Sequence, residues 1–372
     1  MNELSKVSVV LPSLDPDEKL TTVIDGLLEY GFTDIILVND GSKKEKLHYF
    51  EDAAAQHPEI HLLHHPVNRG KGAALKTAFH WFLENRPDGL GVVTVDGDNQ
   101  HHPEDTRACA EHMLQHNKLV LGVRDFSLPD VPARSRSGNK ITSGVFKIFV
   151  GMTISDTQTG LRAIPTRDVK ELIGIYGDRF EYETNMLLAM KEKDIAFDEV
   201  KIRTVYIEEN ESSHFHPIRD SWRIYKLILK HFFRYALSSI ASFVIDSGGV
   251  FLLTWLLSGF GIHDPGLSAI STVGARAVSS LVNFFINKKL VFESNASTGK
   301  AMLRYYALAI PQLAVQWLLD LGLYTAFGVA ESAAGLRTLI HILVMCVLFI
   351  ASYLIQQRWV FSTKKNKPHK EA

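Results

Sequence analysis

Apolar residues are distributed unevenly along this chain, and this limits what it can fold into more than any other feature. Up to about Asn210 the sequence mixes polar and apolar residues, whereas from Phe232 to Phe361 long apolar runs dominate and charges lie mostly between them. Runs of roughly 20 apolar residues are long enough to cross a bilayer as helices. The chain is therefore expected to combine a water-exposed domain with an all-α membrane domain.

Four segments of the second half are long enough to span a membrane. They are residues 235–258, 266–286, 303–329 and 336–356. Lysine and arginine gather on one side of these spans, whereas the loops 259–265 and 330–335 lack them; the basic residues are Arg234, Lys288, Lys289, Lys300, Arg304, Arg358, Lys364 and Lys365. Basic loops stay in the cytoplasm. We therefore expect a multi-pass protein of a bacterial cell membrane with both termini in the cytoplasm.

The membrane half contains an internal repeat. Arg234-Tyr235 recurs as Arg304-Tyr305, and the sequence at 290–292 is echoed at 359–361. This pattern predicts two helix hairpins in parallel orientation. Charged residues inside the spans are costly in lipid and should face the bundle interior; they are Asp246, Arg276, Asp320 and His341. Asp246 and Arg276 could form an ion pair. Such a pair could stabilise the helix bundle, or it could line a path along which a lipid head group crosses the membrane.

The first half alternates short apolar runs with helical stretches. The runs lie at 6–11, 34–38, 60–63, 90–95, 119–123, 161–165 and 197–205. Such alternation is typical of a doubly wound, Rossmann-like α/β domain. Acidic residues follow several of these strands, and open α/β sheets bind ligands at the carboxyl ends of their strands.

The stretch Thr94–Gln100 is the strongest candidate for a metal site. Asp96, Asp98 and Gln100 follow a buried strand at alternate positions. Carboxylate and amide oxygens suit Mg²⁺ or Mn²⁺ better than zinc. An acidic turn without a metal is the alternative, because Asp-Gly and Asn are ordinary turn residues.

Two further stretches contain basic residues that could lie near the candidate metal site. Lys71 lies among glycines at 68–72, where a helix begins, and a helix N-terminus can hold phosphate. The spacing is not that of a P-loop. Arg124 and the basic run 134–140 come before a predicted helix at 141–150. Arginines bind phosphate oxygens in a bidentate way, so these could hold an anionic acceptor; a solvated basic loop is the alternative.

Four motifs in order resemble the family 2 glycosyltransferases of GT-A fold, and most closely the dolichyl-phosphate mannose synthase-like enzymes. They are Val9-Val10-Leu11-Pro12, Val38-Asn39-Asp40-Gly41-Ser42, Asn68-Arg69-Gly70-Lys71-Gly72 and Asp96-Gly97-Asp98-Asn99-Gln100, and the resemblance covers residues 6–206. The second half resembles GtrA-like membrane proteins, with Asn283, Lys288 and Lys289 matching their helix-end pattern.

The resemblance implies transfer of one sugar from a nucleotide-diphosphate sugar to a polyprenyl phosphate such as undecaprenyl phosphate, with inversion. It implies Asp98, Arg124 and Arg136 as catalytic residues and Asp96, Asp98 and Gln100 as metal ligands. The donor would contact Pro12, Asp15, Asp40, Lys71, Asp96 and Gly97. The acceptor phosphate would contact Arg124, Arg136, Thr159 and Arg162.

Several roles stay open at this point. Asp15, Asp17 and Glu18 are alternatives for the acid that faces the nucleotide, and Asp40 could instead cap a tight turn. Glu181 and Glu183 could complement a helix dipole or include a general base. An ionised phosphate acceptor scarcely needs a base, so neither is assigned a catalytic role.

The predicted organisation has four parts. Residues 1–210 form the catalytic domain, 211–234 an amphipathic segment on the membrane surface, 235–362 the membrane domain and 363–372 a basic tail. His214 and His216 in the second part could reach the metal site. The membrane domain anchors the enzyme, could form homo-oligomers and could assist translocation of the product.

Other functions were weighed against this one. The formal net charge of −1 gives no sign of nucleic-acid binding. The alternatives are a processive polysaccharide synthase, or a transporter or scaffold without catalysis. The intact Asp96-x-Asp98-x-Gln100 pattern favours an enzyme.

Overall fold

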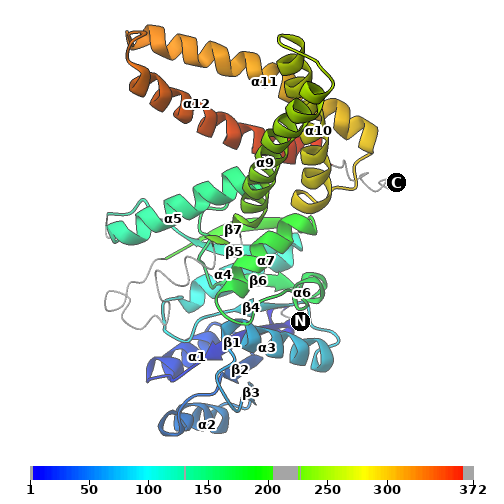
Figure 1. Ribbon diagram of the computed structural model, residues 1–372. Coiled ribbons are helices and arrows are strands. Elements are labelled where there is room, and N and C mark those ends of the chain that lie inside the picture. Colours follow the sequence, from blue (N-terminus) through cyan, green and yellow to red (C-terminus); the bar gives the residue numbers. More distant parts are fainter. Residues whose placement is uncertain (1–2, 130, 204–224, 227, 363–372) are drawn as a thin grey trace, which may run out of the picture. The chain divides into compact units, whose positions relative to one another are not determined.

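The computed structural model describes residues 3–129, 131–203, 225, 226 and 228–362 (Figure 1). The chain forms two compact units, Met1–Ile228 and Leu229–Ala372. Residues 211–224, with His214 and His216, and the tail 363–372 lie outside the described residues. What the sequence predicts for them stays a prediction.

The first unit is built on a seven-stranded sheet with the order β3-β2-β1-β4-β6-β5-β7. Its strands are β1 (Val7–Ser13), β2 (Ile35–Asn39), β3 (Ile60–His64), β4 (Gly91–Thr94), β5 (Leu119–Arg124), β6 (Arg162–Pro165) and β7 (Phe197–Ile202). Every predicted strand is found. β6 runs antiparallel to both neighbours, β4 and β5, while the other strand pairs are parallel. The sheet is therefore mixed.

Helices cover both faces of this sheet. They are α1 (Lys19–Glu29), α2 (Leu47–Gln56), α3 (Lys71–Asn85), α4 (Pro103–His116), α6 (Thr166–Leu172) and α7 (Glu181–Glu192). Successive strand residues point to opposite faces. Val9 accordingly belongs to the core cluster that contains α1, α2 and α4 residues, and Val10 to the cluster that contains α3 and α7 residues. The inner strands β1, β2, β4 and β5 read as largely apolar runs because both of their faces are buried, whereas the edge strands β3 and β7 include polar residues and are only partly buried.

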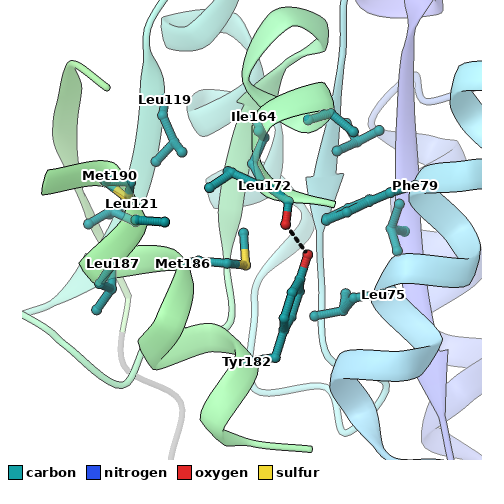
Figure 2. Close-up of a cluster of buried hydrophobic side chains, with 14 of the residues drawn as sticks. Leu75, Phe79, Leu119, Leu121, Ile164, Leu172, Tyr182, Met186, Leu187 and Met190 are labelled. Atoms are coloured by element: carbon teal, nitrogen blue, oxygen red, sulfur yellow. Dashed lines mark hydrogen bonds between the residues drawn. The ribbon is translucent and has the colours of Figure 1, made fainter. Parts of the chain in front are cut away.

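Tyr182 of α7 joins the second cluster through both its ring and its hydroxyl (Figure 2). The ring is fully buried, and the hydroxyl donates a hydrogen bond to the carbonyl oxygen of Leu172, 2.9 Å away. Burial raises the pKa of Tyr182 well above its ordinary value. The hydroxyl therefore stays a donor at any pH at which the protein is studied.

Tyr182→Phe is expected to destabilise the protein by about 1 kcal/mol, because the Leu172 carbonyl loses the buried hydroxyl and keeps only the longer hydrogen bond from the backbone N–H of Ile175, at 3.3 Å. Thermal unfolding of the full chain in detergent would measure this as a lower midpoint. Tyr176→Phe is the matched control, since Tyr176 is 84% exposed. Equal midpoints for the two variants would contradict the prediction.

The basic run after β5 differs from its prediction. Helix α5 spans Ala133–Val145 and continues as a π-helical turn, Phe146–Val150, so residues 134–140 are helical and not a loop. Pro132 is extended and immediately precedes the first turn. Proline is compatible with a helix start, and one glycine inside a helix costs only about 1 kcal/mol, so Gly138 does not stop it.

The second unit contains the four predicted spans. Its helices are α9 (Lys230–Gly259), α10 (Gly266–Ile286), α11 (Thr298–Ala326) and α12 (Ala334–Ile355), and all four are long and apolar enough to cross a membrane. Helices α10 and α12 both end in a π-helical turn, Asn287–Val291 and Gln356–Val360. The same irregularity at equivalent places confirms the sequence repeat as a structural one.

Contacts in the membrane unit follow this repeat. Arg234 donates to the carbonyl oxygen of Leu290 at 3.2 Å, and its counterpart Arg304 donates to that of Trp359 at 2.8 Å. The hairpins meet where the side chain of Asn287 donates to that of Gln356, at 3.1 Å, and where the rings of Phe292 and Phe361 stack, at 5.1 Å between centroids. Both contacts join residues that the repeat makes equivalent.

The charged residues inside the spans are paired. Arg276 Nη2 lies 3.0 Å from Asp246 Oδ2, which confirms the predicted pair, and Ser279 donates to the other oxygen of Asp246 at 2.9 Å. His341 Nδ1 lies 2.7 Å from Asp320 Oδ2. Each pair lies within one hairpin, and both aspartates are largely buried.

Candidate active site

The candidate site lies at the carboxyl ends of β1, β2 and β4. Asp96 lies two residues beyond the end of β4, and the N-termini of α3 and α7 bring Lys71 and Glu183 to it. Lys71 Nζ is 2.7 Å from Asp96 Oδ1 and 3.0 Å from Glu183 Oε1. Burial alone would lower the pKa of Lys71, but the charges of Asp96 and Glu183 raise it above its ordinary value. The ammonium group is therefore charged and shared by two carboxylates.

Two glycines allow this approach. Gly70 has φ +101°, and a Cβ there would lie 2.4 Å from the carbonyl oxygen of Asp178. A Cβ on Gly72 would lie 2.5 Å from the Cβ of Tyr182. The first turn of α3 can therefore pack against the start of α7, which places Lys71 beside Glu183.

The carboxylate of Asp96 also lies close to His101 and to the backbone of Gly160. His101 Nε2 is 3.6 Å from Asp96 Oδ2, and a Cβ on Gly160 would lie 2.4 Å from that same oxygen. Burial opposes ionisation of Asp96, but the charge of Lys71 and the nearness of His101 outweigh it and hold the pKa of Asp96 far below its ordinary value. Asp96 is therefore a carboxylate anion.

Asp98 adds a second carboxylate. Its Oδ1 accepts a hydrogen bond from the backbone N–H of Gln100 at 3.1 Å, and burial together with the charge of Asp96 raises its pKa. Asp96, Asp98 and Glu183 bring three negative charges against the single ammonium of Lys71. This excess of negative charge is what a divalent cation would neutralise, so the oxygen ligands present fit Mg²⁺ or Mn²⁺.

Another group of possible metal ligands among the described residues lies elsewhere. His112, His116 and Asp198 have potential ligand atoms within 4.8 Å of one another. However, Lys118 Nζ lies 3.0 and 3.2 Å from the two carboxylate oxygens of Asp198. Asp198 is thus a single carboxylate beside one ammonium, whereas at Asp96 three carboxylates face one ammonium, so we favour the Asp96 site for the metal.

The side chain of Asp40 binds the backbone of the loop that precedes α3. Its carboxylate accepts hydrogen bonds from the backbone N–H groups of Arg69 and Gly70 at 2.9 and 2.7 Å, and His65 Nδ1 lies 2.7 Å from Oδ1. Asp40 and His65 are both buried. These contacts fix the loop that carries Lys71, and a direct contact of Asp40 with a nucleotide stays a prediction.

The loop after β1 distinguishes the three candidate acids. Asp15 has φ +49°, and its Oδ1 accepts a hydrogen bond from the backbone N–H of Lys43 at 2.8 Å. Its own N–H donates to Ser42 Oγ at 2.8 Å. Asp17 and Glu18 are exposed before α1. Asp15 is therefore the acid that ties the first two loops of the site together.

Two other predicted donor contacts belong to this edge of the sheet. Pro12 is buried in β1, in register with Val38 of β2. A Cβ on Gly97 would lie 3.4 Å from Ser13 Oγ, so the metal-site turn passes close to the end of β1.

The four predicted acceptor residues divide into two groups. Arg124 contacts the fully buried Asp156 through Nε at 2.7 Å and Nη2 at 3.2 Å, and Arg136 on the exposed face of α5 donates to the carbonyl oxygen of Leu128 at 2.8 Å. Arg124 is the last residue of β5 and Arg136 lies in α5, and each has part of its side chain accessible. They remain candidates for an anionic ligand.

Thr159 and Arg162, by contrast, are 2% and 1% exposed. Thr159 donates to the carbonyl oxygen of Gly122. Arg162 donates to the carbonyl oxygens of Thr159 and Glu183 at 3.1 and 2.8 Å. Both side chains therefore bind the protein's own backbone, and a contact of either with the acceptor phosphate stays a prediction.

Glu183 and His101 are the site residues that the sequence prediction missed. The sequence assigns no role to Glu183, and only the packing of α7 on α3 shows that its side chain reaches Lys71. His101 directly follows the predicted ligand Gln100. That adjacency was a usable signal.

A mixed Rossmann-like sheet with paired carboxylates at its carboxyl edge, followed by four membrane helices, defines a membrane glycosyltransferase of GT-A fold. Residues 8–168 match Glycosyl transferase family 2, and residues 234–361 match the GtrA/DPMS transmembrane domain. The chain thus joins a family 2 glycosyltransferase domain to a GtrA/DPMS transmembrane domain.

Three relatives are each similar to part of this chain. An uncharacterized protein of Methanocaldococcus jannaschii is 28% identical over 63% of this chain and 96% of its own length. The UDP-N-acetylglucosamine–dolichyl-phosphate N-acetylglucosaminyltransferase of Methanococcus voltae is 24% identical over 54% of this chain and 86% of its own. The undecaprenyl-phosphate mannosyltransferase of Micrococcus luteus is 26% identical over 42% and 65%.

Proposed function

We propose that this protein transfers one sugar from a nucleotide-diphosphate sugar to a polyprenyl phosphate, and that undecaprenyl phosphate is the acceptor. The observation that carries the proposal is the Asp96–Asp98 carboxylate pair, with Lys71 beside it, in a chain that also has four membrane spans. The names of the two characterised relatives support the class of acceptor, since both act on a polyprenyl phosphate.

The residues of the site suit departure of a diphosphate. Asp96, Asp98 and Gln100 would hold Mg²⁺ or Mn²⁺, which when bound supplies a Lewis acid for the charge on the leaving group. Lys71 adds a fixed positive charge at the N-terminus of α3, where backbone N–H groups also favour phosphate. These groups stabilise charge by position, without a proton transfer.

The acceptor needs little activation. A lipid phosphate is ionised at neutral pH, so it can attack the anomeric carbon directly, and inversion follows from a single displacement. We assign Arg124 and Arg136 to the acceptor phosphate, because one ends β5, the other lies in the following helix α5, and neither side chain is fully buried. Asp156 positions Arg124 through its two contacts.

Arg136→Gln is expected to raise the KM for polyprenyl phosphate by about tenfold to a hundredfold, the usual effect of losing a hydrogen bond to a charged group. The KM for the nucleotide sugar should not change. Steady-state kinetics with each substrate varied in turn would measure both, and Arg167→Gln on the exposed face of α6 is the control. A change confined to the nucleotide sugar would reverse the assignment.

The membrane domain is assigned the role of an anchor in the cell membrane, with both termini in the cytoplasm. The pairing of Asp246 with Arg276, and of Asp320 with His341, supports a structural reason for charges inside the spans. An anchored catalytic domain meets its acceptor at the surface where the lipid phosphate lies.

The proposed function is tested by incubating the full-length protein in detergent with radiolabelled sugar nucleotides and undecaprenyl phosphate or dolichyl phosphate. We expect one sugar-lipid product carrying a single sugar. A polymer would instead support a processive polysaccharide synthase. No transfer with any donor would support a transporter or scaffold.

A further inference from the structure

The ammonium group of Lys71 occupies the same carboxylate that the proposed metal needs. Nζ lies 2.7 Å from Asp96 Oδ1, and Asp96 is the first of the proposed ligands. A divalent cation on Asp96 would be repelled by a positive charge at that distance. Lys71 and the metal therefore compete for Asp96 unless another group draws the ammonium away.

Glu183 is placed to be that other group. Its Oε1 lies 3.0 Å from Lys71 Nζ, so the ammonium already touches both carboxylates. A small movement toward Glu183 would keep Lys71 in an ion pair while it leaves Asp96. The Lys71 side chain is largely buried, so it could not simply turn into solvent instead.

The position of Glu183 is itself fixed. Arg162, a buried guanidinium, donates to the backbone carbonyl of Glu183 at 2.8 Å. Gly72 lets α3 approach Tyr182, the residue before Glu183. Glu181 lies two residues earlier in the same turn and does not share this arrangement, because its Oε1 faces the backbone N–H of Arg179 at 3.4 Å.

We propose that Glu183 is a positioning residue that binds the ammonium of Lys71 and thereby leaves Asp96 able to take up a divalent cation. This inference rests on the proposed function, since it assumes that Asp96 binds the metal. It assigns Glu183 no contact with metal or substrate. Charge supports it, because Asp96, Asp98 and Glu183 together with the ammonium of Lys71 carry two net negative charges, which a divalent cation matches.

The test measures Mn²⁺ binding to the full-length protein in detergent, without donor or acceptor. Binding is monitored by electron paramagnetic resonance, as the loss of the signal of the free ion. Glu183→Gln should weaken Mn²⁺ binding about tenfold, because Lys71 then rests on Asp96 alone. Lys71→Met should strengthen it several-fold, because the competitor is gone. Glu181→Gln, the matched control, should bind like the wild type.

The double variant Lys71→Met with Glu183→Gln is decisive. If Glu183 acts only through Lys71, the double variant should bind Mn²⁺ as tightly as Lys71→Met alone. Equal weakening by Glu183→Gln in both backgrounds would overturn the inference, because Glu183 would then act on the cation directly. Thermal unfolding of each variant identifies any that fail to fold. If Glu183→Gln alone fails to fold, the comparison of the double variant with Lys71→Met still tests whether Glu183 acts on the cation directly.

Failure of this inference can be separated from failure of the proposed function. If the wild type binds Mn²⁺ and transfers sugar but Glu183→Gln binds Mn²⁺ normally, only the role of Glu183 is overturned. If the wild type binds no Mn²⁺, the metal role of Asp96 and the inference are both overturned.

Discussion

Asp98→Asn is expected to lower sugar transfer on the order of a thousandfold while the protein stays folded. Asparagine has nearly the same shape, and its side-chain oxygen can still accept the hydrogen bond from the backbone N–H of Gln100. The negative charge is what is lost. Charge is also what a divalent cation needs from this side chain, so the effect should fall on metal binding and on the rate together.

The measurement is the initial rate at saturating donor and acceptor, with Mn²⁺ titrated, beside thermal unfolding of the same preparation. Asp52→Asn removes the same charge from the exposed face of α2 and should behave as the wild type. Wild-type turnover by Asp98→Asn, or full activity in excess chelator, would rule out the metal mechanism.

Gly160→Ala is expected to reduce transfer on the order of a hundredfold, although Gly160 touches neither substrate nor metal. A Cβ at this position would lie 2.4 Å from Asp96 Oδ2 and 3.0 Å from Asp96 Cγ. One of the two must move. Because Gly160 leads into β6, an interior strand that is hydrogen-bonded to both β4 and β5, the displaced group should be the carboxylate, and displacing it misplaces the proposed metal ligand.

Gly174→Ala adds the same methyl group in open space and serves as the control. Mn²⁺ affinity should fall in Gly160→Ala and stay constant in Gly174→Ala. Normal affinity with a lowered unfolding midpoint in Gly160→Ala would show that the backbone had moved and the carboxylate had not.

Much of the fold could be predicted from the sequence, because buried segments are recognisable by their apolar residues. The inner strands are largely apolar on both faces, and the spans are long and apolar, so both could be located to within a few residues. The direction of β6 could not be predicted. A strand of four residues carries no sign of which way it runs, and its antiparallel pairing with β4 and β5 depends on the chain between.

The site was predictable where its residues are neighbours in sequence and unpredictable where they meet by packing. Asp96, Asp98 and Gln100 form one motif, whereas the contact of Lys71 with Glu183 needs α3 and α7 to pack together. Thr159 and Arg162 also belong to one motif, but the sequence could not show that both side chains are buried and donate to backbone carbonyl oxygens.

The contact between the two membrane hairpins has an evolutionary consequence. Asn287 meets Gln356 and Phe292 meets Phe361, and in each case the partners hold the same position in the two repeats. Contacts between equivalent residues are those of a symmetric dimer. An ancestral gene for one hairpin would thus have encoded a protein that paired with itself, and duplication with fusion would have made that pair a single chain. Asp246–Arg276 and Asp320–His341 fall at different positions of the repeat, so the halves have diverged in their charges and kept the contact that joins them.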